Sequence, residues 1–411
     1  MAKDFSCVGS TECRLGEYIS IRTGRLDANA AETDGEYPFF TCAREISRIN
    51  SWAFDCECVL VAGNCTPHVS YYNGKFNAYQ RVYIIESNDP GRLSTKYLYY
   101  FFKEYMALAI DKQHGAIEKF FCLSDFTEIK ISLPDLPTQL RIAGILGSLD
   151  EKIELNRKKI AELEALAKTI YDYWFVQFDF PDKNGKPYKS SGGKMVWNEQ
   201  LKREVPEGWI AWSVSKCGRF HRGVSYSKAD EVNNDSGTIS VYRGNNIARG
   251  IVVHDSNEVC IPKSMVAKSQ ILQRGQVLIA MSSGSKDHVG KAGLVTRTYP
   301  ERAFGAFCTA FEPFDEYRCL VYDFFRSVTY RSYIKQICSG TGINNLKTEH
   351  LETDILAVPD SHDILEQFNS VQQPLYDRIM CLDEECSAIQ EVRDNLLPLL
   401  MNGQISVREL K

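Results

Sequence analysis

The stretch from Ile142 to Trp174 reads IAGILGSLDEKIELNRKKIAELEALAKTIYDYW and decides the fold of the chain. Alternating steps of four and three residues from Ile142 reach an apolar side chain every time except at Asn156, whereas the residues between are mostly charged. This pattern predicts a helix that packs along one narrow seam. A helix of about 40 residues is roughly 60 Å long, more than one compact domain needs, so we interpret it as a spacer arm. Asn156 either sets the register of the seam or is a tolerated polar residue near its wet end.

Composition is that of an ordinary globular protein. A chain of 411 residues that is 44% hydrophobic and 25% charged predicts two or three domains and excludes disordered and fibrous classes. The sequence has no apolar run of about 18 residues and no apolar leader, so we expect a cytoplasmic protein. Fourteen cysteines are scattered along the chain, and we expect reduced thiols.

The charge is uneven along the chain. The net charge is −5, and residues 360–411 carry 4 lysines and arginines against 10 aspartates and glutamates. Nucleic-acid binding is therefore expected only through local patches, and the acidic C-terminal segment is expected to face a protein.

Two stretches of the chain, 1–135 and 206–359, follow the same plan. Val59–Ala62 before His68 matches Val277–Ala280 before His288, and the closing apolar runs 129–134 and 355–359 match as well. Leu98–Ile110 and Cys319–Ile337 are predicted as aromatic helices. Since the apolar seam also recurs at about 363–401, the chain is a long-period duplication of domain and helix.

The predicted fold class is α+β: two similar mixed α/β domains, separated by two long antiparallel helices that form a coiled-coil spacer and related by an approximate two-fold repeat. Pro374 is expected to kink or restart the second helix, and Pro398 to end it soon afterwards. The predicted boundaries are 1–137 for domain 1, 138–178 for spacer helix 1, 179–208 for a linker, 209–359 for domain 2, and 360–411 for spacer helix 2 with the C-terminal tail.

The predicted linker, rich in Pro, Gly, Lys and Ser, has no counterpart after the second helix. It is either a plain connector or a contact for a partner. Two equivalent domains at a fixed spacing suit a target with two half-sites, and B-DNA offers equivalent groove faces about 34 Å apart per turn.

Motifs for catalysis and for metal binding are absent from the sequence. The nearest approach to a phosphate loop, residues 284–292, has one residue too many and lacks the hydroxyl. There is no G-x-G-x-x-G and no Asn/Asp-Pro-Pro-aromatic tetrapeptide. The residues that come nearest to a zinc site are Cys42, Cys56, Cys58, Cys65 and His68, but they include no C-x-x-C pair. We expect no metal site and no catalytic residue in this chain, which favours a binding protein.

The junction of the first helix, the linker and the second domain resembles a known family. The segments that carry the resemblance are Leu136-Pro137 with Gln139, Ile142–Leu146, Leu149–Asn156, Tyr171–Phe175, Phe178–Pro181 and Gly185–Gly193. Together they strongly resemble the central region of the specificity subunit of type I restriction and modification systems. In that family's architecture the duplication covers essentially the whole chain.

This resemblance implies a DNA-recognition subunit that is not itself catalytic. Each recognition domain would read one half of a bipartite target on double-stranded DNA, and the helices would set the gap. The resemblance also implies two modification subunits, which bind S-adenosylmethionine and methylate adenine N6, and restriction subunits, which use ATP and Mg. The chain itself would hold no cofactor.

Candidate DNA contacts are donors on exposed loops. In domain 1 they are Arg22, Thr23, Arg25, Thr66, His68, Tyr71, Lys112, Gln113 and His114. In domain 2 they are Arg222, Ser225, Tyr226, Arg243, Asn245, Asn246, Ser282, Ser283, Ser285, Lys286, His288, Thr341, Asn344, Asn345 and Lys347. For each of these residues, a solvated loop or turn former is the alternative interpretation.

The candidate partner contacts are the aromatic residues at the end of the first helix: Tyr171, Tyr173, Trp174, Phe175, Phe178 and Phe180. We expect them to dock the methyltransferase subunits. Two other functions stay open at this point, a two-domain scaffold that binds protein and a fused methyltransferase without recognisable motifs. Methyl transfer by the chain alone would establish the second.

Overall fold

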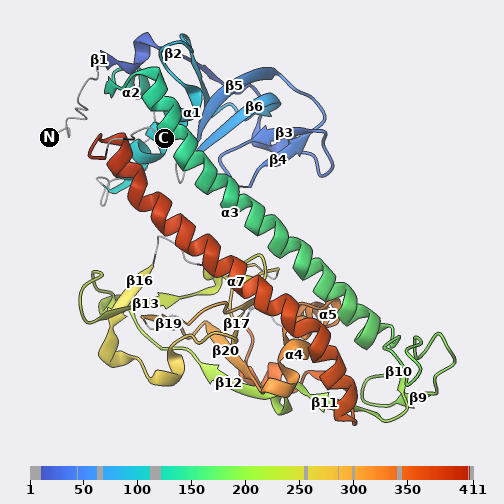
Figure 1. Cartoon of the computed structure of the whole chain (residues 1–411). Helices are drawn as coiled ribbons and strands as arrows, with labels where there is room; N and C mark the ends of the chain where they lie inside the picture. The colour runs from blue at the N-terminus through green and yellow to red at the C-terminus, as the bar shows by residue number, and fades with distance from the viewer. Residues whose placement is uncertain are drawn as a thin grey trace. The chain divides into compact units, whose positions relative to one another are not determined.

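The computed structural model describes residues 11–43, 45–62, 68–111, 122–253, 258–285, 287–298, 301–339, 345–405 and 407. It divides into two compact units, Met1–Glu154 with Ser387–Lys411, and Leu155–Cys386. Mixed α/β domains and long helices are present, as predicted, and the elements are labelled in Figure 1. Within the described residues, no helix is long and apolar enough to cross a membrane.

The first unit is built on a six-stranded sheet with the order β2-β7-β5-β6-β3-β4. Helix α1 (Thr95–Asp111) packs on β5 and β6 (Figure 1), and the short helix α2 (Leu123–Thr127) follows it. The strands are β2 (Ile19–Thr23), β3 (Tyr37–Phe40), β4 (Ser47–Ile49), β5 (Phe54–Ala62), β6 (Val69–Ala78) and β7 (Val82–Ser87), with the separate antiparallel pair β1 (Thr11–Arg14) and β8 (Lys130–Leu133).

Strand β5 is apolar along its second half because both faces of the sheet are covered. Val59 and Val61 pack in the cluster that contains the apolar side chains of α1, whereas Cys58 and Leu60 pack in a second cluster on the other face. Successive residues of a strand point to opposite faces, so a continuous apolar run fills both clusters.

The second unit repeats this arrangement. Its main sheet has the order β12-β20-β17-β18-β15-β14, beside a three-stranded sheet β16-β13-β19 and the antiparallel pair β11-β21. Strands β2-β7-β5 correspond to β12-β20-β17, and β1-β8 to β11-β21, so the predicted repeat is confirmed at the level of topology. The strands are β11 (Trp209–Ser213), β12 (Gly218–Arg222), β13 (Thr238–Tyr242), β14 (Ile247–Ala248), β15 (Ile251–Val252), β16 (Val259–Pro262), β17 (Val277–Ala280), β18 (Ala292–Leu294), β19 (Arg302–Phe304), β20 (Cys308–Pro313) and β21 (Ile355–Pro359).

The aromatic helix of the second unit differs from the prediction. Instead of one helix over 319–337, the structure has α4 (Arg318–Phe324) and α5 (Val328–Ser339), followed later by α6 (Thr348–Glu352). Ser327 explains the break, because its hydroxyl accepts a hydrogen bond from the Tyr330 N–H at 3.1 Å and so starts a new helix.

The predicted linker is also more ordered than expected. It contains the hairpin β9 (Met195–Asn198) and β10 (Arg203–Pro206). Before the hairpin, the Asp179 carboxylate accepts hydrogen bonds from the N–H and hydroxyl of Ser190, and the Tyr188 ring stacks on Phe180 with centroids 4.8 Å apart. These local bonds fix the turns of a segment whose composition alone predicted a loop.

The two long helices are α3 (Leu136–Tyr171) and α7 (His362–Met401), and each contributes one end to each unit. A π-helical turn, Asp172–Val176, follows α3. Of the kink or restart expected at Pro374, the restart is wrong, because α7 continues through the proline. Neighbouring seam residues such as Gln372 and Tyr376 are fully buried and hold the chain on both sides of the proline. The helix ends at Met401, three residues after Pro398, as predicted.

In the second unit α3 and α7 run antiparallel and share polar contacts within an apolar seam. The Asn156 side chain is fully buried and donates to Glu385 at 2.9 Å, and Gln372 donates to the Ala167 carbonyl at 2.8 Å. Asn156 is thus a buried cross-helix contact rather than a residue at a wet end, which supports its interpretation as a register setter.

Helix α4 joins this seam through a buried acid. The Tyr376 hydroxyl and the Gln372 amide donate to the two oxygens of Asp323 at 2.6 and 3.0 Å. Burial raises the pKa of Asp323 to about 8, although the hydrogen bond from Tyr376 opposes the shift. An acid in a dry, fully bonded position is a structural contact, since nothing leaves it open to a substrate.

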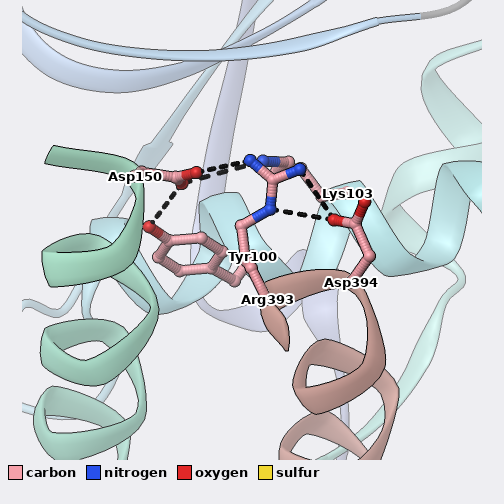
Figure 2. A network of polar contacts seen from close by, with 5 residues as sticks. All are labelled: Tyr100, Lys103, Asp150, Arg393 and Asp394. Carbon is pink, nitrogen blue, oxygen red and sulfur yellow. Dashed lines mark hydrogen bonds and ion pairs between the residues drawn. The ribbon is translucent and has the colours of Figure 1, made fainter. Parts of the chain in front are cut away.

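In the first unit the corresponding contact centres on Asp150 of α3 (Figure 2). One oxygen accepts from the Tyr100 hydroxyl of α1 at 2.9 Å, and the other accepts from the Arg393 guanidinium of α7 at 2.6 Å. Lys103 lies 3.7 Å from the same carboxylate, and Arg393 also bonds Asp394. Three helices therefore meet at one carboxylate, with the side chains of Asp150 and Arg393 only 24% and 16% exposed.

We predict that Arg393→Met lowers the free energy of unfolding by roughly 1–3 kcal/mol, because a largely buried carboxylate loses its charged donor. Urea unfolding of the full chain measures this change. Arg378→Met is the matched control, since Arg378 is an exposed arginine on the same helix. Equal stability of the two variants would contradict a stabilising role for the contact between Arg393 and Asp150.

Candidate nucleic-acid interface

One edge of the main sheet in the second unit collects four chain segments. Strands β12 and β17 are both antiparallel to β20, with Arg222 opposite Thr309 and Ala280 opposite Cys308. The ends of β12 and β17 therefore flank the beginning of β20. We call the segments 222–226, 281–283, 305–308 and 345–347 the rim of this unit.

Backbone hydrogen bonds tie the rim segments together. Val224 N–H donates to the Phe304 carbonyl at 2.8 Å, and Ala306 N–H donates back to Val224 at 2.9 Å. Met281 N–H donates to the Phe307 carbonyl, and its own carbonyl accepts from Leu346 N–H at 2.7 Å. Side chains placed on these segments are consequently held on a rigid frame.

In each unit a glycine allows two backbone segments of the rim to approach each other closely. A Cβ atom on Gly223 would lie 2.1 Å from the Gly305 carbonyl oxygen, and one on Gly24 would lie 2.2 Å from the Ala78 oxygen in the first unit. Both glycines follow equivalent strands, β2 and β12, so the same steric requirement applies in the two units.

The rim gathers several residues that the sequence analysis singled out. Ser282 and Asn345 hydrogen-bond each other across two segments. Burial raises the pKa of Tyr226, and the positive charge of Arg243 opposes part of this shift. Arg222 is 3.8 Å from Glu349, a long contact between two exposed side chains. The predicted residues brought together here are Arg222, Ser225, Tyr226, Arg243, Ser282, Asn345 and Lys347.

The DNA contact predicted at Asn246 is corrected, because its side chain hydrogen-bonds the protein's own backbone. It is buried, its oxygen accepts from Arg243 N–H at 2.9 Å, and its amide donates to the Val253 carbonyl at 3.2 Å. Its role is to shape the turn, and no polar atom is directed to a ligand. Asn245 beside it is exposed.

Other predicted residues of this unit form the neighbouring turn. The hydroxyl of Ser283 accepts from Ser285 N–H at 3.2 Å, and that of Ser285 accepts from Asp287 N–H at 3.3 Å. His288 is exposed at the same turn. These three residues remain predictions, whereas Lys286, Thr341 and Asn344 lie outside the described residues.

The first unit has an equivalent rim, which we define as segments 23–26 and 79–82. Leu26 bridges Tyr79 as Val224 bridges Gly305, and Gln80 N–H donates to Leu26 as Ala306 donates to Val224. Thr23 and Arg25 are exposed here. His68 is half-buried at the start of β6, and its backbone carbonyl bonds Ala62 N–H at 3.1 Å.

Arg22 and Tyr71 lie on the faces of the sheet and are already engaged. Arg22 bonds Glu86 and lies over the Phe54 ring at 5.3 Å. The Tyr71 hydroxyl donates to Glu57 at 2.7 Å, and its ring lies 6.1 Å from that of Tyr99 on α1. This correction gives Tyr71 a packing role. Thr66, Lys112, Gln113 and His114 lie outside the described residues.

The aromatic residues predicted as partner contacts are mostly core residues, and this too is a correction. Only Tyr173 is exposed among them; Tyr171, Trp174, Phe175, Phe178 and Phe180 are buried in the largest cluster of the second unit. Phe175 packs edge-on against Phe368 of α7 at 4.8 Å and against Trp209 at 5.4 Å. The rings fasten the end of α3 to α7 and β11, because burial of each large apolar side chain stabilises by roughly 1.5–3 kcal/mol.

Two observations concern metal and thiol chemistry in the described residues. No group of three or more His, Cys, Asp or Glu residues there is placed to hold a metal ion. Burial raises the pKa of Cys217, Cys308 and Cys319 to about 12, so these thiols stay protonated at neutral pH. The groups that the rims do offer are hydrogen-bond donors and guanidinium charges, which suit phosphates and base edges.

Comparison with known proteins agrees with this chemistry. Residues 8–165 match the family model described as type I restriction modification DNA specificity domain. The chain is 41% identical over 154 residues to the Escherichia coli type I restriction enzyme EcoDI specificity subunit, and 26% identical over 329 residues to the MjaIX specificity subunit of Methanocaldococcus jannaschii. These matches cover 38% and 77% of this chain.

Over these residues the chain is similar to type I restriction enzyme specificity subunits. The match spans 34% of the length of the E. coli relative and 70% of the archaeal one. A solved type I system S subunit from M. genitalium has a similar fold, with a TM-score of 0.56 at 16% identity over 95% of each chain. Specificity subunits are named for DNA recognition, and the rims carry the donors that such recognition needs.

Two further residues on the rims, Arg81 and Phe307, are not singled out by the sequence. Neither belongs to a motif, and the turn that carries each one is visible only once distant strands are paired. The pairing of β2 with β7, and of β12 with β20, places these turns beside the predicted donors.

We predict that Arg222→Ala with Arg243→Ala lowers the affinity of the subunit, in complex with its partners, for DNA and flattens its salt dependence. Each lost phosphate contact reduces the slope of log K against log salt by about 0.9. Binding to duplex DNA over a salt series measures the slope. Arg274→Ala is a control of the same type, since Arg274 bonds Glu384 of α7; an unchanged slope in the double variant removes both residues from the interface.

Proposed function

We propose that the chain is the DNA-recognition subunit of a type I restriction and modification complex and performs no catalysis itself. The observation that carries this proposal is the equivalent rim in each unit, a rigid strand-end frame that presents arginine, hydroxyl and amide donors. Equivalent frames in a duplicated chain suit a bipartite target, with one half-site for each recognition domain.

In this proposal the long helices set the gap between the half-sites. Buried polar contacts support such a role: Asp150 with Arg393 in the first unit, and Asn156 with Glu385 in the second. Polar groups in an apolar seam favour one register over the others, because any slip leaves them without a hydrogen bond.

The partners follow from the same proposal. Two modification subunits would supply S-adenosylmethionine and methylate adenine, and restriction subunits would supply ATP and Mg chemistry. In this proposal the chain itself contributes binding surfaces only.

An exposed apolar stripe on α3 is the surface we propose for docking a modification subunit, in place of the buried rings. Leu155 and Leu166 are 49% and 48% exposed, and Tyr173 at the following turn is also exposed. Their spacings are close to whole numbers of helical turns, so they lie along one line of the helix, away from the seam. Large apolar side chains aligned on a solvent face mark a protein contact.

The function is tested by purifying the chain with the modification subunits of its host. The complex is expected to methylate a duplex carrying the target mapped from modified adenines in the host genome, and to leave a scrambled duplex unmodified. Methyl transfer by the chain alone would establish the fused methyltransferase instead. A complex that does not distinguish the duplexes would leave the protein-binding scaffold as the better interpretation.

We predict that Leu155→Ser with Leu166→Ser reduces co-purification of the modification subunit at least tenfold, because two large apolar contacts are removed from the interface. Quantitative pull-down measures the bound subunit. Val328→Ser is the control, since Val328 is a more exposed apolar residue of the same unit on α5. Unchanged stoichiometry with an unchanged urea midpoint would contradict docking on this stripe.

A further inference from the structure

The turn Gly305–Cys308 in the rim of the second unit presents an unusual side chain. Cys308 N–H donates to the Gly305 carbonyl at 2.8 Å, which closes the turn, and Phe307 at its third position is 68% exposed. A phenylalanine held in water forgoes most of the stabilisation that burial of its side chain would give.

The exposure of Phe307 is imposed by a rigid backbone. Gly305 N–H bonds the Tyr242 carbonyl at 2.9 Å, Ala306 N–H bonds Val224, and the Phe307 carbonyl accepts from Met281 N–H at 2.8 Å. Every residue of the turn is therefore bonded to another strand end. The ring is directed away from the core by the frame itself.

The surroundings of Phe307 are polar. The segments bonded to its turn carry Arg222, Ser282 and Asn345, and Lys347 follows two residues after Asn345. Donors of this kind contact phosphates and base edges, and an aromatic ring among them can touch a thymine methyl group or wedge against a base step. A protein-docking site would instead surround the ring with further apolar side chains.

The first unit places a different residue at the same position. Its turn is closed by Val82 N–H donating to the Tyr79 carbonyl at 2.9 Å, and the bridges Leu26–Tyr79 and Val224–Gly305 align the two turns. Arg81 then corresponds to Phe307, and its side chain is exposed. Arginine is the commonest side chain to recognise guanine in the major groove.

We propose that the third residue of this turn contacts a base in each half-site: Phe307 by apolar contact in one, and Arg81 by hydrogen bonds to guanine in the other. The proposal rests on the proposed DNA-recognition function. It would let a duplicated fold recognise two unlike half-sites, because equivalent backbone positions carry unlike side chains.

The test measures binding of the subunit, in complex with the modification subunits, to a duplex carrying the mapped target and to a scrambled duplex. Phe307→Ala should lower the affinity for the target about tenfold or more, with little loss on the scrambled duplex. The salt dependence should stay as in the wild type, since no charge is removed. Phe314→Ala is the control, because Phe314 is a partly exposed phenylalanine just past the opposite end of β20.

Arg81→Ala gives a second, independent readout. Affinities for targets with single base-pair changes should show that this variant no longer distinguishes one position, and that position should lie in the half-site unaffected by Phe307→Ala. The two variants together therefore assign each turn to its half-site.

Each remaining outcome has one meaning. If the wild-type complex does not prefer its target, the proposed function fails. If it does, and Phe307→Ala binds the target like wild type or loses affinity equally for both duplexes, base contact by this residue is overturned. Loss of the modification subunit from Phe307→Ala would overturn it too, because the ring would then serve a protein interface.

Discussion

The seam between α3 and α7 is the constraint on which each unit depends. In the first unit Ile142, Ala143 and Leu146 pack in the same cluster as Leu397 and Leu400, and in the second Ile160 and Ala167 pack with residues of the other end of α7. Each recognition domain is attached to this seam by its own helix, α1 or α4. Within each unit, side chains therefore hold the domain against its own part of the seam.

The attachment uses the same pair of residue types in both units, with donor and acceptor exchanged. Tyr100 of the domain helix donates to Asp150 of α3, whereas Tyr376 of α7 donates to Asp323 of the domain helix. A buried carboxylate facing another carboxylate would be strongly unfavourable, so each domain helix complements its own stretch of seam better than the other. In a duplicated chain this exchange discriminates between two otherwise similar attachments.

The rims illustrate how a rigid frame and variable chemistry coexist. Glycines at 24 and 223 allow two strand ends to approach within a distance that no Cβ tolerates, and backbone bonds then fix the turns around them. Main-chain hydrogen bonds hold these turns, so their backbone course does not require one particular side-chain type at each position. Positions such as Arg81 and Phe307 can then differ without loss of the fold.

The sequence by itself determined the long helices, the duplication, the closing strands and the resemblance to specificity subunits. These follow from periodicity, matched spacing and local motifs, which are properties of neighbouring residues. It also identified part of the second rim, because Arg222, Ser282 and Asn345 are polar residues at predicted loop positions. It could not show that Trp174 and Phe175 face inward, since an aromatic cluster at helical spacing suits a core and an interface equally well.

Only the tertiary structure decided which polar residues share one edge and which ones shape turns. The Asn246 side chain accepts a hydrogen bond from the Arg243 backbone, and the Tyr71 hydroxyl donates to Glu57. Helix α7 continues through Pro374 because buried neighbouring side chains hold it. Phe307 became a candidate because strands that are far apart in the sequence bond its turn and direct the ring to solvent. The exposure of a side chain depends on what distant segments cover, and that is settled when the chain packs.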